Sequence, residues 1–411
     1  MKKARTLAEA LNVFDPEKVL ATETELKDWF VQRPQSPLKE ILVLLQTATT
    51  PQRLLFTGHR GAGKSSELAM LASQLEDRFF IVNFSIKRVA DLTDLTYVDV
   101  VLTLAAEVFR QASDKGVTVN QTLLEDVQRW FAEEVLEQVS ATEKGGEAGV
   151  SLAPFIVKLE GRLRTEASTR TTVRLRVEHQ LSDLVEKLNL MIEEVKRVTK
   201  QPVLVILEDL DKVDLARAKD LFCGHAASLT APSCSIIYTF PIALRRDNEY
   251  PQMRQNFTEM YPLPNIAITH RDGTDDDQGL KSLERILHNR IEEALLEPSA
   301  GMALARSSGG LPRELITLGR RACLFALQTG AEAIGSEAVE KAVLRRRMDY
   351  EILLSSRQLE LLKAVRKTKR VENDEAHRDL LHNLSALEYH NGEGVWYDVH
   401  PVVQPLVSVD T

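Results

Sequence analysis

The segment Gly58–Ser65, with the sequence GHRGAGKS, constrains the fold of this chain more than any other. It matches the pattern G-x-x-x-x-G-K-[ST] at every fixed position, which is a highly specific match. The apolar run at 53–57 (RLLFT) directly before it suits a buried parallel strand, and helix-forming residues begin at Lys64. A second apolar run at 79–84 (FFIVNF) predicts the next strand. The chain therefore opens a βαβ unit around a glycine-rich loop.

This glycine-rich loop has the chemistry of a phosphate-binding site. Its glycines allow backbone N–H groups to turn inward around phosphates, and the following helix adds the positive end of its dipole. We expect Lys64 to reach the β- and γ-phosphates and Ser65 to give its hydroxyl to Mg²⁺. A chance glycine-rich turn is the alternative, and the strand and helix on either side argue against it. The predicted ligand is ATP with Mg²⁺, and the predicted binding residues are Gly58, His59, Arg60, Gly61, Ala62, Gly63, Lys64, Ser65, Ser66 and Arg313.

An acidic cluster follows the third predicted strand, 203–207 (VLVIL). Glu208, Asp209 and Asp211 stand where a buried strand would meet the nucleotide, and carboxylates there hold Mg²⁺ through water and orient an attacking water. We expect Ser65 on the metal side together with Glu208 or Asp209. The water-orienting base is either Asp209 or Asp211. The alternative for Asp211 is that it caps the next helix.

Two polar residues further along the chain are candidates for sensing the nucleotide. Thr239 lies at the end of a fourth predicted strand, 235–240 (SIIYTF), where its hydroxyl can reach the γ-phosphate; β-branched filling is the alternative. In GGLPR, proline at the first turn of a helix lets Arg313 point at the phosphates, and a surface salt bridge is the alternative. The residues predicted to take part in catalysis are Lys64, Glu208, Asp209, Asp211, Thr239 and Arg313.

For other charged clusters, a structural explanation stands beside the functional one. Arg245 and Arg246 are candidates for an arginine finger in a neighbouring subunit, although exposed arginine pairs are common. The acidic loop at 272–279 lacks the spacing of a calcium loop and is expected to be a solvated connection. Four basic residues near the end of the chain can contact DNA phosphates or form a solvated face: Arg366, Lys367, Lys369 and Arg370.

Four strands of buried type, separated by helical segments, predict an α/β fold: a P-loop NTPase parallel sheet with helices on both faces. Asn391-Gly392 between alternating runs signals a β-hairpin near the end of the chain. Helices followed by such a hairpin are the layout of a winged helix. The expected organisation is an N-terminal extension at 1–36, an ATPase core at 37–270 with a mostly helical insertion at about 92–200, a helical lid at 271–348 and a winged-helix domain at 349–411.

Composition narrows the classes of protein and of site that fit this chain. A net charge of −8 over 411 residues argues against a protein that coats nucleic acid by charge alone. The three cysteines are scattered without CxxC spacing, so neither a disulfide framework nor a zinc site is indicated. Because the chain lacks a run of eighteen apolar residues and a secretory signal, we expect a cytoplasmic location and no membrane partner.

With these motifs together, the chain resembles the AAA+ and STAND superfamily of P-loop ATPases. GHRGAGKSSEL is similar to their Walker A motif, VLVILEDLD to a Walker B motif and GGLPREL to the sensor 2 motif at the start of a lid helix. The order of these parts is similar to that of the origin-recognition initiators and of bacterial STAND regulators. Two features depart from the pattern: Glu208 stands where Asp is usual, and the insertion before the acidic cluster is long.

The resemblance implies a molecular switch, in which ATP between core and lid sets their relative angle and hydrolysis resets it. Such a switch would form homo-oligomers or regulate a partner effector protein, as in bacterial defence systems. The alternative is a DNA-binding initiator or loader that uses the winged helix. A small-molecule kinase is disfavoured, because the lid and winged-helix segments have no role in one.

Overall fold

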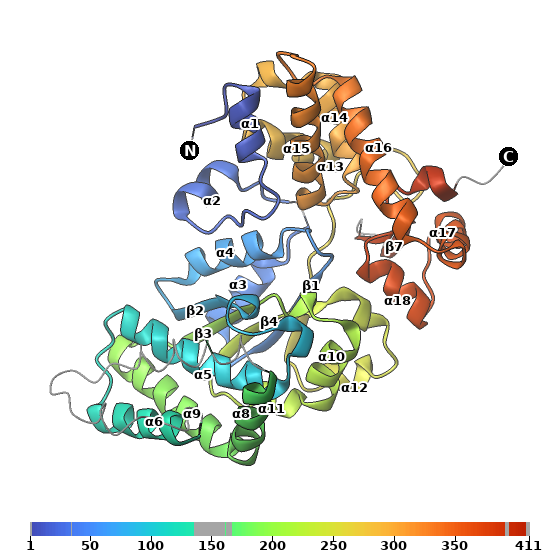
Figure 1. Cartoon of the computed structure of the whole chain (residues 1–411). Coiled ribbons are helices and arrows are strands. Elements are labelled where there is room, and N and C mark those ends of the chain that lie inside the picture. The colour runs from blue at the N-terminus through green and yellow to red at the C-terminus, as the bar shows by residue number, and fades with distance from the viewer. Residues whose placement is uncertain (1, 34, 135–160, 162–166, 391–393, 408–411) are drawn as a thin grey trace.

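The computed structural model contains a five-stranded parallel sheet in the order β2-β3-β4-β1-β5 (Figure 1). The structure describes all residues except 1, 34, 135–160, 162–166, 391–393 and 408–411. The four strands predicted from the sequence are confirmed. The fifth was missed because it is a short edge strand whose first residue is exposed. The strands are β1 (Arg53–Gly58), β2 (Phe80–Ser85), β3 (Val203–Glu208), β4 (Ser235–Pro241) and β5 (Glu259–Pro262).

The register of the sheet brings the predicted site residues to one edge. Gly58 at the end of β1 pairs with Pro241 of β4, and Ser85 at the end of β2 pairs with Glu208 of β3. Because all these strands are parallel, their carboxyl ends meet at the same side of the sheet. The glycine-rich loop, the acidic cluster and Thr239 therefore lie close together.

Both faces of the sheet are covered by helices, as predicted. Alternate side chains of the strands enter two separate hydrophobic clusters, one on each face. One cluster is closed by α3 (Leu38–Thr47) and α4 (Lys64–Leu75). The other is closed by α5 (Tyr97–Asp114) and α9 (Leu181–Thr199), which belong to the segment read from the sequence as an insertion.

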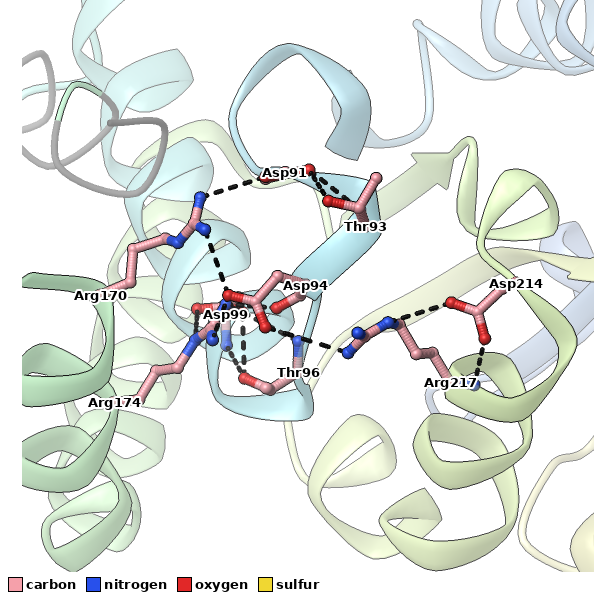
Figure 2. A network of polar contacts seen from close by, with 9 residues as sticks. All are labelled: Asp91, Thr93, Asp94, Thr96, Asp99, Arg170, Arg174, Asp214 and Arg217. Carbon is pink, nitrogen blue, oxygen red and sulfur yellow. Dashed lines mark hydrogen bonds and ion pairs between the residues drawn. The ribbon is translucent and has the colours of Figure 1, made fainter. Parts of the chain in front are cut away.

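The described part of that segment is helical, with α6 (Gln121–Glu134) and α8 (Ala167–His179) beside α5 and α9. The sequence at 150–164 is compatible with either a short hairpin or a continuation of helix. Nearly all of it, and the glycine-rich stretch at 144–149, lie outside the described residues. Figure 2 shows how α8 is fastened to the loop before α5. Arg174 binds the carboxylates of Asp94 (2.9 Å) and Asp99 (2.7 Å), and Arg170 binds Asp91 (3.2 Å).

A second helical layer lies above the sheet (Figure 1). Its helices α13 (Asp277–His288), α14 (Pro298–Ser307), α15 (Pro312–Gln328) and α16 (Ser336–Leu353) share one hydrophobic cluster. The N-terminal helix α1 (Leu7–Val13) packs into the same cluster, whereas α2 (Glu23–Trp29) packs against α4 of the core. The first thirty residues therefore connect the lid layer to the core.

The last segment contains α17 (Ser356–Thr368), α18 (Glu375–His382) and an antiparallel hairpin of β6 (Ala386–His390) and β7 (Val395–Val399). The predicted hairpin is thus confirmed, while the winged-helix interpretation and the domain boundaries stay predictions. None of the described helices is long and apolar enough to cross a membrane. The remaining short helices are α10 (Leu215–Lys219), α11 (Ala226–Thr230) and α12 (Tyr250–Arg254), with 3-10 turns at Ile86–Arg88, Leu92–Asp94, Leu210–Lys212, Ile242–Arg246, Glu293–Leu295 and Gln404–Val407 and a π turn at Asp220–Gly224.

Candidate nucleotide-binding site

The glycine-rich loop has a backbone that only glycine adopts without strain at two of its positions. Gly61 and Gly63 have φ of +80° and +94°, in the left-handed region. A Cβ at Gly61 would also lie 2.9 Å from Cβ of Arg313. The Arg313 backbone N–H donates to the Gly61 carbonyl at 3.1 Å. The loop is therefore in direct contact with the first turn of α15.

Lys64 lies at the centre of the site and is 7% exposed. Its ammonium donates to the Gly58 carbonyl (2.8 Å) and the His59 carbonyl (2.9 Å) and pairs with Asp211 (2.8 Å). Burial alone would raise the pKa of Asp211, but the Lys64 ammonium outweighs burial and leaves the pKa below its ordinary value. The predicted lysine and one predicted carboxylate thus form a buried ion pair.

Ser65 and Glu208, two of the three predicted metal ligands, lie next to each other. The Ser65 hydroxyl hydrogen-bonds to the Glu208 carboxylate. Burial, and then repulsion from Asp209 and Asp211, raises the pKa of Glu208 above its ordinary value. A divalent cation would relieve this repulsion, so a hydroxyl beside this carboxylate fits Mg²⁺.

The third predicted metal ligand, Asp209, is held on both carboxylate oxygens. Oδ2 accepts from the Ser85 hydroxyl at 2.5 Å, and Oδ1 pairs with Lys212 at 2.6 Å. Within the described residues, no three His, Cys, Asp or Glu side chains gather into a metal cage. Mg²⁺ does not need one, because it keeps water and phosphate oxygens as ligands.

Thr239, on β4, holds the turn that carries the acidic residues after β3. The Thr239 hydroxyl accepts from the Leu210 N–H at 3.1 Å and also hydrogen-bonds to Asp211. Asp211 is not a helix cap, because Asp214 caps the next helix, α10. Thr239 is 1% exposed and lines the same pocket as Lys64. Its hydroxyl therefore does more than fill space in the strand.

A pocket of about 850 Å³, which includes space open to solvent, joins these residues to the lid and to the N-terminal segment. The loop, Asp209, Asp211 and Thr239 supply polar groups. The apolar wall comes from the N-terminal segment and from α13 and α15, and its residues are Val13, Val19, Leu20, Trp29, Ile286 and Ile316.

Arg313 lies where the sequence predicted it, at the first turn of α15 and in the wall of the pocket. Its Nε donates to the Pro16 carbonyl at 3.0 Å. The side chain is therefore oriented by the N-terminal segment. One residue of the lid thus contacts both the glycine-rich loop and the N-terminal extension.

His59 and Arg60 of the glycine-rich loop direct their side chains to the C-terminal segment. His59 is 1% exposed, and its Nε2 accepts the backbone N–H of Glu388 at 2.7 Å. Burial lowers the pKa of His59 to about 4, so the ring is neutral near pH 7. Arg60 donates to the Lys212 carbonyl (2.9 Å) and lies 2.9 Å from His382 Nε2.

The two candidate finger arginines are used within the chain. Arg245 pairs with the buried carboxylate of Glu388 at 2.5 Å. The Arg246 guanidinium lies 5.0 Å from the centroid of the Tyr397 ring. In this conformation both arginines connect the core to the C-terminal hairpin, so neither is available to a neighbouring subunit.

Sequence reasoning missed two residues that shape the site. Arg33 is 7% exposed and donates to the carbonyls of Ala62 (2.6 Å) and Pro264 (2.9 Å), and it pairs with Glu67 (3.0 Å). Nothing in the local sequence around Arg33 signals these contacts. Ser85 was detectable as a polar residue at the end of a buried strand, one strand away from the acidic cluster.

No family model and no curated protein matches this chain. Solved structures of similar arrangement include Cdc6p from Pyrobaculum aerophilum, at 13% identity over 96% of this chain and 95% of that one, with a TM-score of 0.44. The ORC1 protein of Aeropyrum pernix in complex with DNA matches at 15% identity over 97% and 96%, with a TM-score of 0.42. The RuvB Holliday junction branch migration motor of Thermotoga maritima matches at 12% identity over 95% and 98%, with a TM-score of 0.38. At these identities and TM-scores the likeness transfers no activity, ligand or partner to this chain.

Proposed function

We propose that this chain is a molecular switch that binds and hydrolyses Mg-ATP. The observation that carries the proposal is that Lys64, Asp211 and Ser65 line one pocket between the core, the lid and the N-terminal segment, with Glu208 beside Ser65. A lysine, a hydroxyl and carboxylates beside a glycine-rich loop suit a triphosphate with its cation.

Each polar group has a distinct task in this proposal. Lys64 and Arg313 bind the phosphates, one from the core and one from the lid. Ser65, with Glu208 or Asp209, would hold Mg²⁺, which when bound neutralises charge on the phosphate oxygens. Asp209, which Ser85 orients, or Asp211 accepts a proton from the attacking water. Thr239 positions the acidic turn against the pocket.

The C-terminal hairpin gives the switch an output. Strand β6 contacts the core through the Glu388 N–H on His59, and the lid through the Tyr389 hydroxyl on the Gly309 carbonyl at 2.9 Å. A change in the angle between core and lid moves these two anchor points apart or together. The proposed role is to regulate a partner protein or to assemble into a homo-oligomer, as the resemblance to STAND regulators implies, including in bacterial defence.

The test is nucleotide binding and phosphate release by the full chain, with Lys64→Ala and Asp209→Asn as variants. We expect Lys64→Ala to lose nucleotide binding or turnover, because it removes a cation from the phosphates. Asp209→Asn is expected to retain ATP and release phosphate slowly. The exposed Lys341→Ala is the matched control and leaves both unchanged. Turnover at the wild-type rate by Lys64→Ala refutes the site.

The second candidate function is the binding of DNA by the C-terminal segment. Helix α18, which a winged helix would insert into DNA, packs against the core turn Ile242–Arg246. Arg378 of this helix donates to the Arg246 carbonyl at 3.4 Å, and His382 lies against Arg60. DNA binding therefore requires that this contact opens. Sizing the protein with and without ATP, alone and with duplex DNA, separates the two candidates.

A further inference from the structure

Arg290 is a buried cation that the proposed catalytic groups do not use. It follows α13, is 9% exposed and lines the pocket that contains Lys64. Among the described residues it forms no ion pair, and its guanidinium donates to the backbone carbonyl of Ile286 at 2.8 Å. Burial alone lowers the pKa of Arg290 to about 10, with no carboxylate acting against it. A buried guanidinium without a counter-charge is costly unless a ligand interacts with it.

Trp29 holds this guanidinium from one side. The Arg290 guanidinium carbon lies 5.0 Å from the centroid of the Trp29 ring. Trp29 is 2% exposed and lines the same pocket, and its indole N–H has no acceptor among the described residues. A buried donor without an acceptor in the same wall is an independent sign of a ligand. Arginine and tryptophan both donate only, so the ligand must offer a π face or acceptor atoms.

The surroundings of Arg290 distinguish a base from a phosphate. The same wall holds the apolar side chains of Ile286, four residues earlier, and of Ile316 on α15, and Lys18 lies 5.0 Å from the centroid of the Trp29 ring. The groups that suit phosphate, namely Lys64 and the N–H groups of the loop, belong to the core. An apolar wall with a planar cation suits a purine, which has a large π face and ring nitrogens that accept hydrogen bonds.

We propose that Arg290, positioned by Trp29, is a base-contacting residue that receives the purine of the bound nucleoside triphosphate. The guanidinium lies between the indole ring and the base. This inference rests on the proposed nucleotide site and adds to it the part of the ligand that distinguishes a nucleotide from a free polyphosphate.

The experiment measures the affinity of the full chain for ATP and for inorganic tripolyphosphate. We expect Arg290→Ala to weaken the binding of ATP about tenfold and to leave the affinity for tripolyphosphate unchanged. Arg290→Lys keeps the charge and loses the planar group, so most of the loss persists. Trp29→Phe, which keeps a ring and removes the indole N–H, gives a smaller loss for ATP alone. Arg285→Ala, which replaces an exposed arginine on α13, is the matched control and changes neither affinity.

The outcomes separate this inference from the proposed function. Equal weakening of both ligands by Arg290→Ala assigns the residue to the phosphates and overturns the inference, and so does unchanged ATP affinity. Unchanged tripolyphosphate binding also shows that the variant is folded. If the wild-type chain binds neither ligand, the proposed function fails first. If Lys64→Ala loses both ligands while Arg290→Ala loses only ATP, both assignments stand.

Discussion

Gly61 combines a positive φ with a close contact to another part of the chain, as Gly309 and Gly310 also do. Its φ of +80° is one that glycine tolerates, and the space where a Cβ would lie is taken by Cβ of Arg313 at 2.9 Å. Gly116 has a similar φ of +70° with nothing within 4 Å of its missing Cβ. The two glycines therefore form a matched pair, in which only Gly61 couples the backbone to the lid.

Alanine at either glycine adds left-handed strain of about 1 to 2 kcal/mol. At Gly61 the new methyl group also displaces Arg313 from the loop. We expect Gly61→Ala to weaken the binding of ATP at least about tenfold. Gly116→Ala is expected to lower the free energy of unfolding about as much as Gly61→Ala does, without changing the affinity for ATP. Calorimetric titration together with urea unfolding measures both. Equal ATP affinities for the two variants would show that the contact between lid and loop is not needed for binding.

At the scale of single elements, the sequence predicted what depends on local pattern. The four buried strands could be predicted because their apolar runs are continuous. The loop between β1 and α4 could be predicted because its glycines stand at the fixed positions of a phosphate-binding motif. The edge strand β5 was not readable, since four residues with an exposed start carry no periodic signal. The role of α5 and α9 in covering the sheet was also hidden, because it depends on packing between elements far apart in the sequence.

The clearest test at this scale is Arg174, which joins α8 to the start of α5. Its partner Asp99 is 1% exposed and also completes the capping box of α5 with Thr96. Arg174→Ala leaves this carboxylate buried without its cation, and we expect unfolding to become easier by about 2 to 4 kcal/mol. Arg197→Ala, which removes the exposed partner of Glu194, is expected to change the free energy of unfolding much less. Similar costs in urea unfolding would mean that the network in Figure 2 does not anchor the helix.

At the scale of the whole molecule, the candidate site is built from contacts that no local pattern reveals. Arg33 reaches Pro264 across 231 positions, and His59 meets Glu388 across 329. The sequence identified Lys64, Ser65 and Arg313 because motifs fix their spacing. It gave no sign that residues 13–29 complete the pocket, nor that the variable positions of the loop face the C-terminal hairpin. Such contacts exist only after the chain has folded.

Acid should weaken the contact between His59 and Glu388. The ring of His59 is surrounded by Lys64, Arg245 and Glu388, and burial dominates, so its pKa falls from about 6.5 to about 4 on folding. The neutral ring is thus the folded form. Its contribution to stability is complete above pH 6.5 and is lost as pH falls towards 4, by about 2 kcal/mol between pH 7 and pH 5.

His59→Gln keeps an acceptor for the Glu388 N–H and removes the titration. We expect its unfolding free energy to depend less on pH than that of the wild type, by about 2 kcal/mol over this interval. The exposed His179→Gln is the control and keeps the wild-type dependence. His382 and His400, whose pKa values burial also lowers to about 4, retain their share of the pH dependence in every variant. An unchanged slope in His59→Gln would mean that this histidine opens to water before the molecule unfolds, so that the hairpin leaves the loop in a separate step.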